Sequence, residues 1–259
     1  MNKLICCDAV VGLKTLPDDS IPLVVTSPPW DDMRKYGRHE WTFEKFETIA
    51  SHLWRVVGQG GVVCWHVADQ IKDCSETLSS FRQALHFQHL GFCVNTLVID
   101  SYMPGKPKYR YGSGVQYVFV LSKGCPLVFQ PICDVPNKSA GEIEVFNNRD
   151  ADGELHYSHP KVVKAFRARN AVWRFNNGGR TDPDLTRQHP AVFNERLVRD
   201  LIRSFSVTGN IVLDCFSGVG TTAAVALAEG RRYLGFEINP EYHELAVERL
   251  RRTSARLVA

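Results

Sequence analysis

A glycine-rich turn close to the C-terminal end constrains the fold of this chain more than any other feature. In the stretch NIVLDCFSGVGTTAAVALAEG an apolar strand is predicted to end at Asp214, and a helix follows the glycines. Gly218, Gly220 and Ala223 match the spacing G-x-G-x-x-G/A, which lets a ligand approach the backbone at a helix N-terminus. A second apolar strand delivers Glu237, 23 residues after Asp214, where a carboxylate can bind two ribose hydroxyls. This order of elements predicts a nucleotide-binding site.

The position of the turn determines how the sheet must be assembled. About forty residues follow the glycines, too few to complete a nucleotide-binding sheet. The other strands must come from the N-terminal half, where NKLICCD, IPLVVT, GVVCWHVAD, FCVNTLVID and VQYVFVLSK are predicted strands. NAD, FAD and S-adenosylmethionine all bind to such turns, but the permuted order argues against NAD. We expect an α/β fold with a circularly permuted Rossmann-like sheet and helices on both faces.

The middle of the chain interrupts the alternation of strands and helices. From about residue 125 to residue 180 no period is sustained, and Pro, Asn, Asp and Gly are frequent. We interpret this stretch as a small inserted region, which divides the chain into residues 1–124, 125–180 and 181–259. Among the helices outside it, one is predicted with Ser75 as its N-cap and one from Pro190.

Composition excludes several classes of protein. The chain is 44% hydrophobic and 23% charged, which is ordinary for a folded globular protein and excludes disorder. No stretch approaches the roughly eighteen apolar residues of a membrane-spanning helix, and the start does not resemble a signal peptide, so we expect a cytoplasmic protein. None of the eight cysteines has the spacing C-x-x-C, and we predict reduced thiols and no metal site. The net charge of +3 is too small to indicate an acidic partner.

A second constellation, VVTSPPW, directly follows a predicted strand. Pro28 and Pro29 fix φ and remove two backbone donors, which leaves a rigid edge of carbonyl acceptors. Ser27 adds a hydroxyl acceptor, and Trp30 adds a planar face. Such a group suits the exocyclic amine of a nucleobase, because the oxygens accept its N–H bonds while the indole stacks on the ring. A proline-stiffened turn with a partly buried tryptophan is the alternative, and the neighbouring nucleotide motif argues against it.

Together, TSPPW, DCFSGVGTT and YLGFEINPEY resemble the permuted amino-methyltransferases of DNA, which methylate N4 of cytosine or N6 of adenine with S-adenosylmethionine. The resemblance covers most of the chain and implies that residues 125–180 recognise the target sequence. It implies a catalytic set consisting of Ser27, Pro28, Pro29 and Trp30. It also implies cofactor contacts from the opening segment, from a His-Pro segment and from the two C-terminal motifs, namely Asp8, His189, Pro190, Asp214, Phe216, Ser217, Gly218, Gly220, Thr221, Thr222, Glu237 and Asn239.

Within that family, a serine before Pro-Pro is typical of N4-cytosine enzymes, and an Asp or Asn is typical of N6-adenine enzymes. Ser27 therefore favours cytosine, with adenine as the alternative. The chain departs from the family pattern at Pro22, where many relatives have an acid, and at Trp30, where Tyr or Phe is commoner. Neither change removes an acceptor or the stacking face.

Basic residues interleaved with Phe166, Trp173 and Phe175 suggest where DNA binds. Cationic side chains neutralise phosphates and release counterions, and aromatic rings can stack on an opened helix. The alternative is a solvated basic face with some core aromatics. The predicted DNA contacts are Lys106, Lys108, Arg110, Lys164, Arg167, Arg169, Arg174 and Arg180.

Other functions remain open at this stage. An NAD-dependent oxidoreductase would explain the glycine turn but not TSPPW, and a silent DNA-binding module would bind DNA without methyl transfer. The favoured interpretation is a sequence-specific DNA methyltransferase that acts on duplex DNA in a prokaryote or a phage. A cognate restriction endonuclease is a further expected partner, and the alternatives of a monomer and a homodimer stay open.

Overall fold

The chain folds into two compact units, which are described separately. One unit comprises Met1–Gln130 and Ala171–Ala259, and the other comprises Pro131–Asn170. The second unit is shorter than the inserted region predicted from the sequence. The computed structural model describes residues 2–31, 41–101, 109, 111–112, 114–145, 147–175, 182–189 and 191–258.

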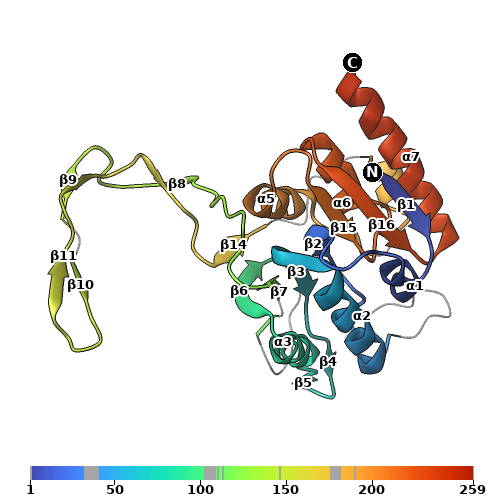
Figure 1. Ribbon diagram of the computed structural model, residues 1–259, viewed down its shortest axis with the longest axis horizontal. Coiled ribbons are helices and arrows are strands. Elements are labelled where there is room, and N and C mark those ends of the chain that lie inside the picture. Colours follow the sequence, from blue (N-terminus) through green and yellow to red (C-terminus); the bar gives the residue numbers. More distant parts are fainter. Residues whose placement is uncertain are drawn as a thin grey trace. The chain divides into compact units, whose positions relative to one another are not determined.

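An eight-stranded sheet forms the centre of the first unit (Figure 1). All its neighbouring strands pair in parallel except β7, which is antiparallel to both β3 and β6. The two C-terminal strands β15 and β16 lie between β1 and β2, so the permuted order predicted from the glycine turn is confirmed. The strands in spatial order are β1 (Lys3–Cys6), β16 (Arg232–Glu237), β15 (Ile211–Asp214), β2 (Ile21–Thr26), β3 (Val57–Val67), β7 (Val115–Ser122), β6 (Cys93–Asp100) and β14 (Val172–Arg174).

Helices cover both faces of this sheet (Figure 1). One face carries α1 (Ala9–Lys14), α2 (Phe43–Val56) and α3 (Ser79–His89), and the other carries α5 (Glu195–Phe205), α6 (Thr221–Ala228) and α7 (Pro240–Val258). The short helix α4 (Pro183–Thr186) precedes α5. Strand β2 belongs to both cores, because Leu23 and Val25 pack in one hydrophobic cluster and Val24 packs in the other. A strand that is buried on both faces explains the unbroken apolar run IPLVVT.

Two helix starts differ from the sequence prediction. Ser75 does not cap a helix, because it lies in β5 (Ser75–Glu76), which pairs with β4 (Ile71–Lys72). Helix α3 begins later, where the carboxylate of Asp69 accepts hydrogen bonds from the backbone N–H and the hydroxyl of Ser80, at 2.9 and 2.6 Å. The helix predicted from Pro190 begins at Glu195 instead, where Asn194 is the N-cap.

The second unit consists of short antiparallel strand pairs. Several apolar side chains on these strands are exposed, among them Ile143, Tyr157, Val162 and Phe166. Isolated two-stranded pairs are at best marginally stable in water, so this unit has little core of its own. The pairs are β8 (Val135–Pro136) with β13 (Phe166–Arg167), β9 (Ile143–Glu144) with β12 (Lys161–Val162), and β10 (Asn147–Arg149) with β11 (Leu155–Tyr157).

Neither unit contains a candidate membrane span. Within the described ranges, every helix is too short or too polar to cross a lipid bilayer.

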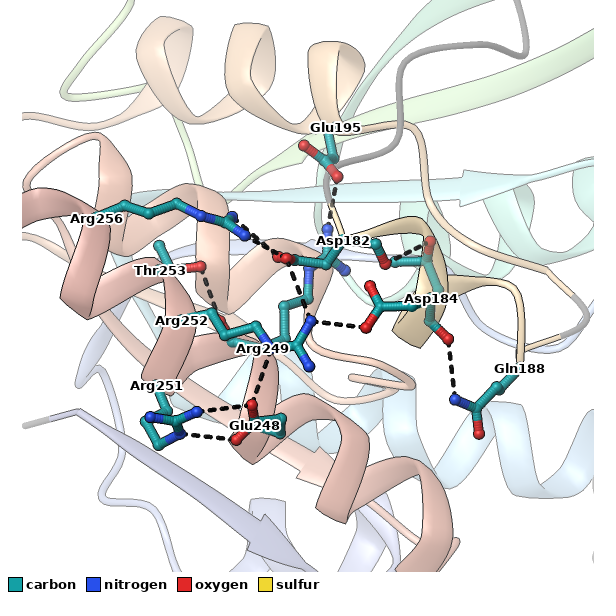
Figure 2. A network of polar contacts seen from close by, with 11 residues as sticks. Asp182, Asp184, Gln188, Glu195, Glu248, Arg249, Arg251, Arg252, Thr253 and Arg256 are labelled. Carbon is teal, nitrogen blue, oxygen red and sulfur yellow. Dashed lines mark hydrogen bonds and ion pairs between the residues drawn. The ribbon is translucent and has the colours of Figure 1, made fainter.

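A fully buried arginine connects three elements of the first unit (Figure 2). Arg249 of α7 donates to Glu195 Oε1 at 2.6 Å, and Glu195 is the first residue of α5. The same guanidinium donates to Thr221 Oγ1 at 2.9 Å and to the carbonyl of Val219 at 3.2 Å. A buried charge is tolerated only when it is paired and hydrogen-bonded, and these contacts meet that condition. Arg249 therefore holds the glycine turn against α5 and α7.

More exposed ion pairs surround Arg249 (Figure 2). Arg252 donates to Asp184 at 2.7 Å, and Arg256 pairs with Asp182. These contacts attach the segment around α4 to α7.

Replacement of Arg249 by Leu is expected to lower the free energy of unfolding by about 3–5 kcal/mol, because the buried carboxylate of Glu195 then loses the guanidinium that pairs with it. Urea denaturation followed by circular dichroism measures this loss. The control is Arg251→Leu, which breaks a solvent-exposed pair with Glu248 and should change stability little. Equal losses in the two variants would contradict the role of burial.

Candidate active site

Three strands of the sheet end next to one another at the same edge, and polar residues follow each of them. Strands β2, β15 and β16 end in Thr26, Asp214 and Glu237, and their parallel pairing places these ends together. Thr26 Oγ1 donates to Asp214 Oδ1 at 2.6 Å, and both side chains are buried. Burial raises the pKa of Asp214, and the hydrogen bonds from Thr26 and from the N–H of Phe216 oppose that shift. This edge is where open α/β sheets bind their ligands.

The glycine turn adopts a backbone that L side chains rarely reach. Gly218 and Gly220 have φ values of +48° and +72°. The carboxylate of Glu237 accepts hydrogen bonds from the N–H of Gly218 at 2.6 Å and from the N–H of Asn239 at 2.9 Å. Burial raises the pKa of Glu237, and these two N–H groups counteract the rise. The predicted acid therefore lies directly against the turn.

His189 also reaches the glycine turn. A Cβ atom added at Gly218 would lie 3.1 Å from His189 Nε2, so the absence of that atom leaves the histidine room. His189 Nδ1 accepts from the N–H of Ala191 at 3.1 Å, and its ring meets the edge of Tyr242 at a centroid distance of 4.5 Å. Pro190 lies outside the described residues.

Asp8 lies between strand β1 and helix α1, two residues after the last residue of β1. It caps α1 by accepting from the N–H of Val10 at 2.8 Å, and it forms a 2.7 Å ion pair with Lys45. Burial alone would raise the pKa of Asp8, but the bond from Lys45 lowers it below its ordinary value. The adjacent Cys7 N–H donates to the carbonyl of Glu237 at 2.9 Å. Asp8 is thereby held beside the strand that carries Glu237.

The other predicted cofactor residues belong to the same turn and the helices that follow it. Ser217 is buried and its hydroxyl donates to the carbonyl of Asp214 at 3.3 Å. Thr221 and Thr222 are buried, and the hydroxyl of Thr222 donates to the carbonyl of Val25 at 3.3 Å. Asn239 Oδ1 accepts from the N–H of Glu241 at 2.8 Å at the start of α7. Phe216 is partly buried, and its ring lies 5.5 Å from that of Trp41.

The motif TSPPW begins with Thr26, the last residue of β2, and leaves the sheet at Ser27. Ser27 Oγ lies 3.2 Å from the carbonyl oxygen of His66, to which it donates, and 3.3 Å from His66 Nδ1. Trp30 Nε1 donates to the same carbonyl at 3.2 Å. Between them, Pro28 is buried and Pro29 is half-buried, which leaves the motif rigid. The motif therefore forms a fixed surface at the same edge as the glycine turn.

His66 is a site residue that the sequence analysis missed. It lies on β3, is only 5% exposed, and its Nε2 lies 2.9 Å from Oε1 of Gln116. Its ring stacks on Phe193, with centroids 4.9 Å apart and planes inclined by 6°. Burial lowers the pKa of His66 to about 4 while the bond to Gln116 opposes this, so the imidazole is neutral at neutral pH. The one signal in the sequence was a histidine within a strand that is otherwise apolar.

The predicted DNA contacts fall into different environments. Lys164 and Arg167 are exposed residues of the second unit, whereas Arg169 donates to Asp134 at 2.9 Å. In the first unit Arg174 is exposed and pairs with Asp100 at 2.7 Å. The remaining predicted contacts, which lie outside the described residues, are Lys106, Lys108, Arg110 and Arg180.

The interpretation of Trp173 and Phe175 as rings that stack on DNA is wrong. Trp173 lies on the edge strand β14, and the two side chains are only 7% and 6% exposed. Both belong to the hydrophobic cluster that also contains Leu23 and Val25. Phe166 of the second unit is half exposed and stays a candidate for such a contact.

Comparison with known proteins shows the family to which the chain belongs. The family described as DNA methylase, which comprises N6 and N4 methyltransferases, matches residues 21–248. The chain belongs to this family and is a DNA methyltransferase.

Individual relatives cover nearly the whole chain. The orphan methyltransferase M.BamHII of Bacillus amyloliquefaciens is 41% identical over 245 residues, 92% of this chain and 91% of the relative. The DNA adenine methyltransferase YhdJ of Escherichia coli is 27% identical over 252 residues, 94% of this chain and 80% of the relative.

Solved structures share the fold. The PvuII DNA methyltransferase, which is cytosine-N4-specific, has a TM-score of 0.70 at 20% identity, covering 98% of this chain and 90% of that one. The M1.HpyAVI–SAM complex has a TM-score of 0.61 at 20% identity, covering 96% and 99%.

Replacement of Gly220 by Ala tests how closely the turn is packed. The new Cβ would lie 2.9 Å from the Cβ of Ala246. At Gly209, which has a similar φ of +84°, a Cβ would meet nothing within 4 Å. Gly209→Ala should cost about 1–2 kcal/mol for the left-handed backbone alone, and Gly220→Ala should cost about 1–3 kcal/mol more for overpacking. Urea denaturation measures the loss of stability in both variants. Equal losses would show that Ala246 moves away from the new Cβ at no cost in stability.

Proposed function

We propose that this protein transfers the methyl group of S-adenosylmethionine to the exocyclic N4 amine of a cytosine in duplex DNA. The observation that carries the proposal is the position of Ser27. Ser27 directly follows Thr26 at the end of β2, and its hydroxyl and the indole of Trp30 bond to the same carbonyl. The hydrogen bond from Thr26 to Asp214 connects β2 to β15, the strand that leads into the glycine turn. A hydrogen-bond acceptor, a planar ring and a nucleotide-binding turn at one edge of the sheet suit methylation of a nucleobase amine.

The residues at the glycine turn fit the proposed cofactor. A Cβ at Gly218 would crowd His189, so only a glycine at this position leaves space beside the histidine ring. Glu237 offers a carboxylate to a ribose, and helix α6 begins directly after the glycine turn. We assign Asp8, His189, Asp214, Phe216, Glu237 and Asn239, with the turn residues Ser217, Gly218, Gly220, Thr221 and Thr222, to this site. S-adenosylmethionine supplies an electrophilic methyl group on a sulfonium.

The chain's own residues would position the accepting amine. The target base has to leave the duplex, because its amino group is inaccessible inside the base stack, and the face of Trp30 then receives it. The lone pair of that amine is delocalised into the ring, which makes it a poor nucleophile. Ser27 Oγ and the carbonyl of Pro28 accept its two N–H bonds and hold the nitrogen toward the methyl group.

The choice of cytosine rests on the serine before Pro-Pro. Ser27 is the residue type typical of N4-cytosine enzymes in the family that the sequence resembles. The structural neighbour PvuII DNA methyltransferase carries the description cytosine-N4-specific, which supports the proposal. The alternative is methylation of adenine N6, which the relative YhdJ favours by its description as a DNA adenine methyltransferase.

The short second unit, with exposed Lys164 and Arg167, is proposed to contact the DNA backbone and to contribute to target recognition. Long cationic side chains on thin strand pairs can reach phosphates, and each neutralised phosphate releases counterions. Arg169 is a weaker candidate, because Asp134 already neutralises its charge.

Product analysis distinguishes the two target bases. The purified protein is incubated with S-adenosylmethionine and unmethylated duplex DNA, and the digested nucleosides are identified by mass spectrometry. We expect N4-methylcytosine. N6-methyladenine would retain the fold, the cofactor and the catalytic motif but would refute the assignment of the base from Ser27.

Removal of two cationic groups tests the proposed DNA contact. Lys164→Ala combined with Arg167→Ala should weaken DNA binding and reduce the slope of log K against log [salt] by about two, since each lost phosphate contact removes roughly 0.9 from it. Fluorescence anisotropy at several salt concentrations measures the slope. The matched control removes two exposed charges from helices of the first unit, Lys14→Ala with Arg251→Ala. If the two double variants have the same slope, the second unit does not contact phosphates.

A further inference from the structure

One histidine contacts both ends of the catalytic motif. The backbone carbonyl of His66 accepts from the hydroxyl of Ser27 and from the indole N–H of Trp30, each at 3.2 Å. Its Nδ1 lies 3.3 Å from Ser27 Oγ, and its ring forms a T-shaped contact with the ring of Trp30, with centroids 5.2 Å apart. Among the residues that the structure describes, no other residue forms hydrogen bonds with the side chains of both Ser27 and Trp30.

The partners of the ring determine which nitrogen carries the proton. Nε2 lies 2.9 Å from the amide oxygen of Gln116, an acceptor, so Nε2 carries the hydrogen and donates it. The imidazole is neutral because burial disfavours its charged form. Nδ1 therefore presents a lone pair to Ser27, and stacking against Phe193 fixes the plane of the ring.

This arrangement directs the hydroxyl of Ser27. A serine hydroxyl has one proton to donate and two lone pairs to accept with. Both described acceptors of the Ser27 proton, the carbonyl oxygen and Nδ1, belong to His66. Whichever of them takes the proton, both lone pairs of Ser27 Oγ remain for a substrate.

We propose that His66 is a positioning residue for methyl transfer, which keeps Ser27 an acceptor and holds Trp30 beside it, with Gln116 selecting the required tautomer. The inference rests on the catalytic role proposed for Ser27. It extends that role to a residue that does not touch the substrate. His66 acts by keeping the proton of Ser27 away from the incoming amine, whose N–H bonds need an acceptor.

Two substitutions of His66 separate positioning from packing. His66→Ala removes the ring contacts but retains the backbone carbonyl, and we expect kcat to fall about tenfold, as for the loss of one hydrogen bond. His66→Asn places an amide oxygen close to the position of Nδ1, and it should restore kcat to within about threefold of the unmodified protein. The affinity for S-adenosylmethionine, measured by calorimetry, should stay unchanged in both variants.

Gln116→Glu supplies a second test that leaves the histidine in place. The carboxylate would favour the imidazolium form, in which Nδ1 donates to Ser27 and consumes one of its lone pairs. We expect kcat of this variant to decline as the pH falls from 8 to 6 and to recover at high pH. The unmodified protein should show no such decline, because the pKa of His66 is about 4 and the ring's described contacts, Ser27, Trp30, Gln116 and Phe193, are uncharged. Gln116→Leu is the matched control without a new charge.

Ser27→Ala serves as the reference for these variants. If Ser27→Ala has full activity, the proposed catalytic role of Ser27 fails, and the role of His66 fails with it. If Ser27→Ala is inactive while His66→Ala keeps its kcat and Gln116→Glu keeps its pH profile, the role of Ser27 stands and that of His66 is overturned. An equal loss of kcat in His66→Ala and His66→Asn, accompanied by lower melting temperatures, would show that the ring serves packing alone and would also overturn it.

Discussion

The buried hydrogen bond between Thr26 and Asp214 joins the two halves of the proposed active site. Its partners are 188 residues apart in the chain, and its length is 2.6 Å. Because β2 and β15 are adjacent parallel strands, their ends meet at one edge, and this bond fixes the offset between them. Ser27 follows Thr26 directly, and the glycine turn follows Asp214 within four residues. A shift of β2 by one residue would turn Thr26 to the other face and separate the two motifs.

Much of this arrangement could be predicted from the sequence because its determinants are local. A strand that ends in an acid, followed by glycines with positive φ and a helix, encodes its geometry within about fifteen residues. The short length of chain after that turn required strands from the N-terminal half, and the sheet confirms this. His189 was placed by resemblance alone, and its ring does lie beside Gly218.

What the sequence could not provide depends on contacts between distant elements. His66, Gln116 and Phe193 come from β3, from β7 and from the segment before α5, and no spacing links them. Trp173 and Phe175 were misinterpreted because an edge strand that packs on a core and a basic surface that binds DNA both alternate aromatic with charged residues. The pairing of β14 with β6 decides between these two interpretations, because its register places Trp173 opposite Ile99 in the sheet. The start of α3 was misplaced because Asp69, which accepts from the hydroxyl of Ser79 at the start of that helix, is ten residues away in the chain.

The distribution of charge in the site follows from the cost of burying it. Asp214 is buried and Glu237 is partly buried, and each carboxylate accepts hydrogen bonds from backbone N–H groups that offset the loss of water. On the side of Ser27 the described polar groups, Ser27, His66 and Gln116, are neutral. A carboxylate at the position of His66 would need donors of its own to offset its loss of water. A neutral imidazole held by a neutral amide supplies an acceptor for the serine without that cost.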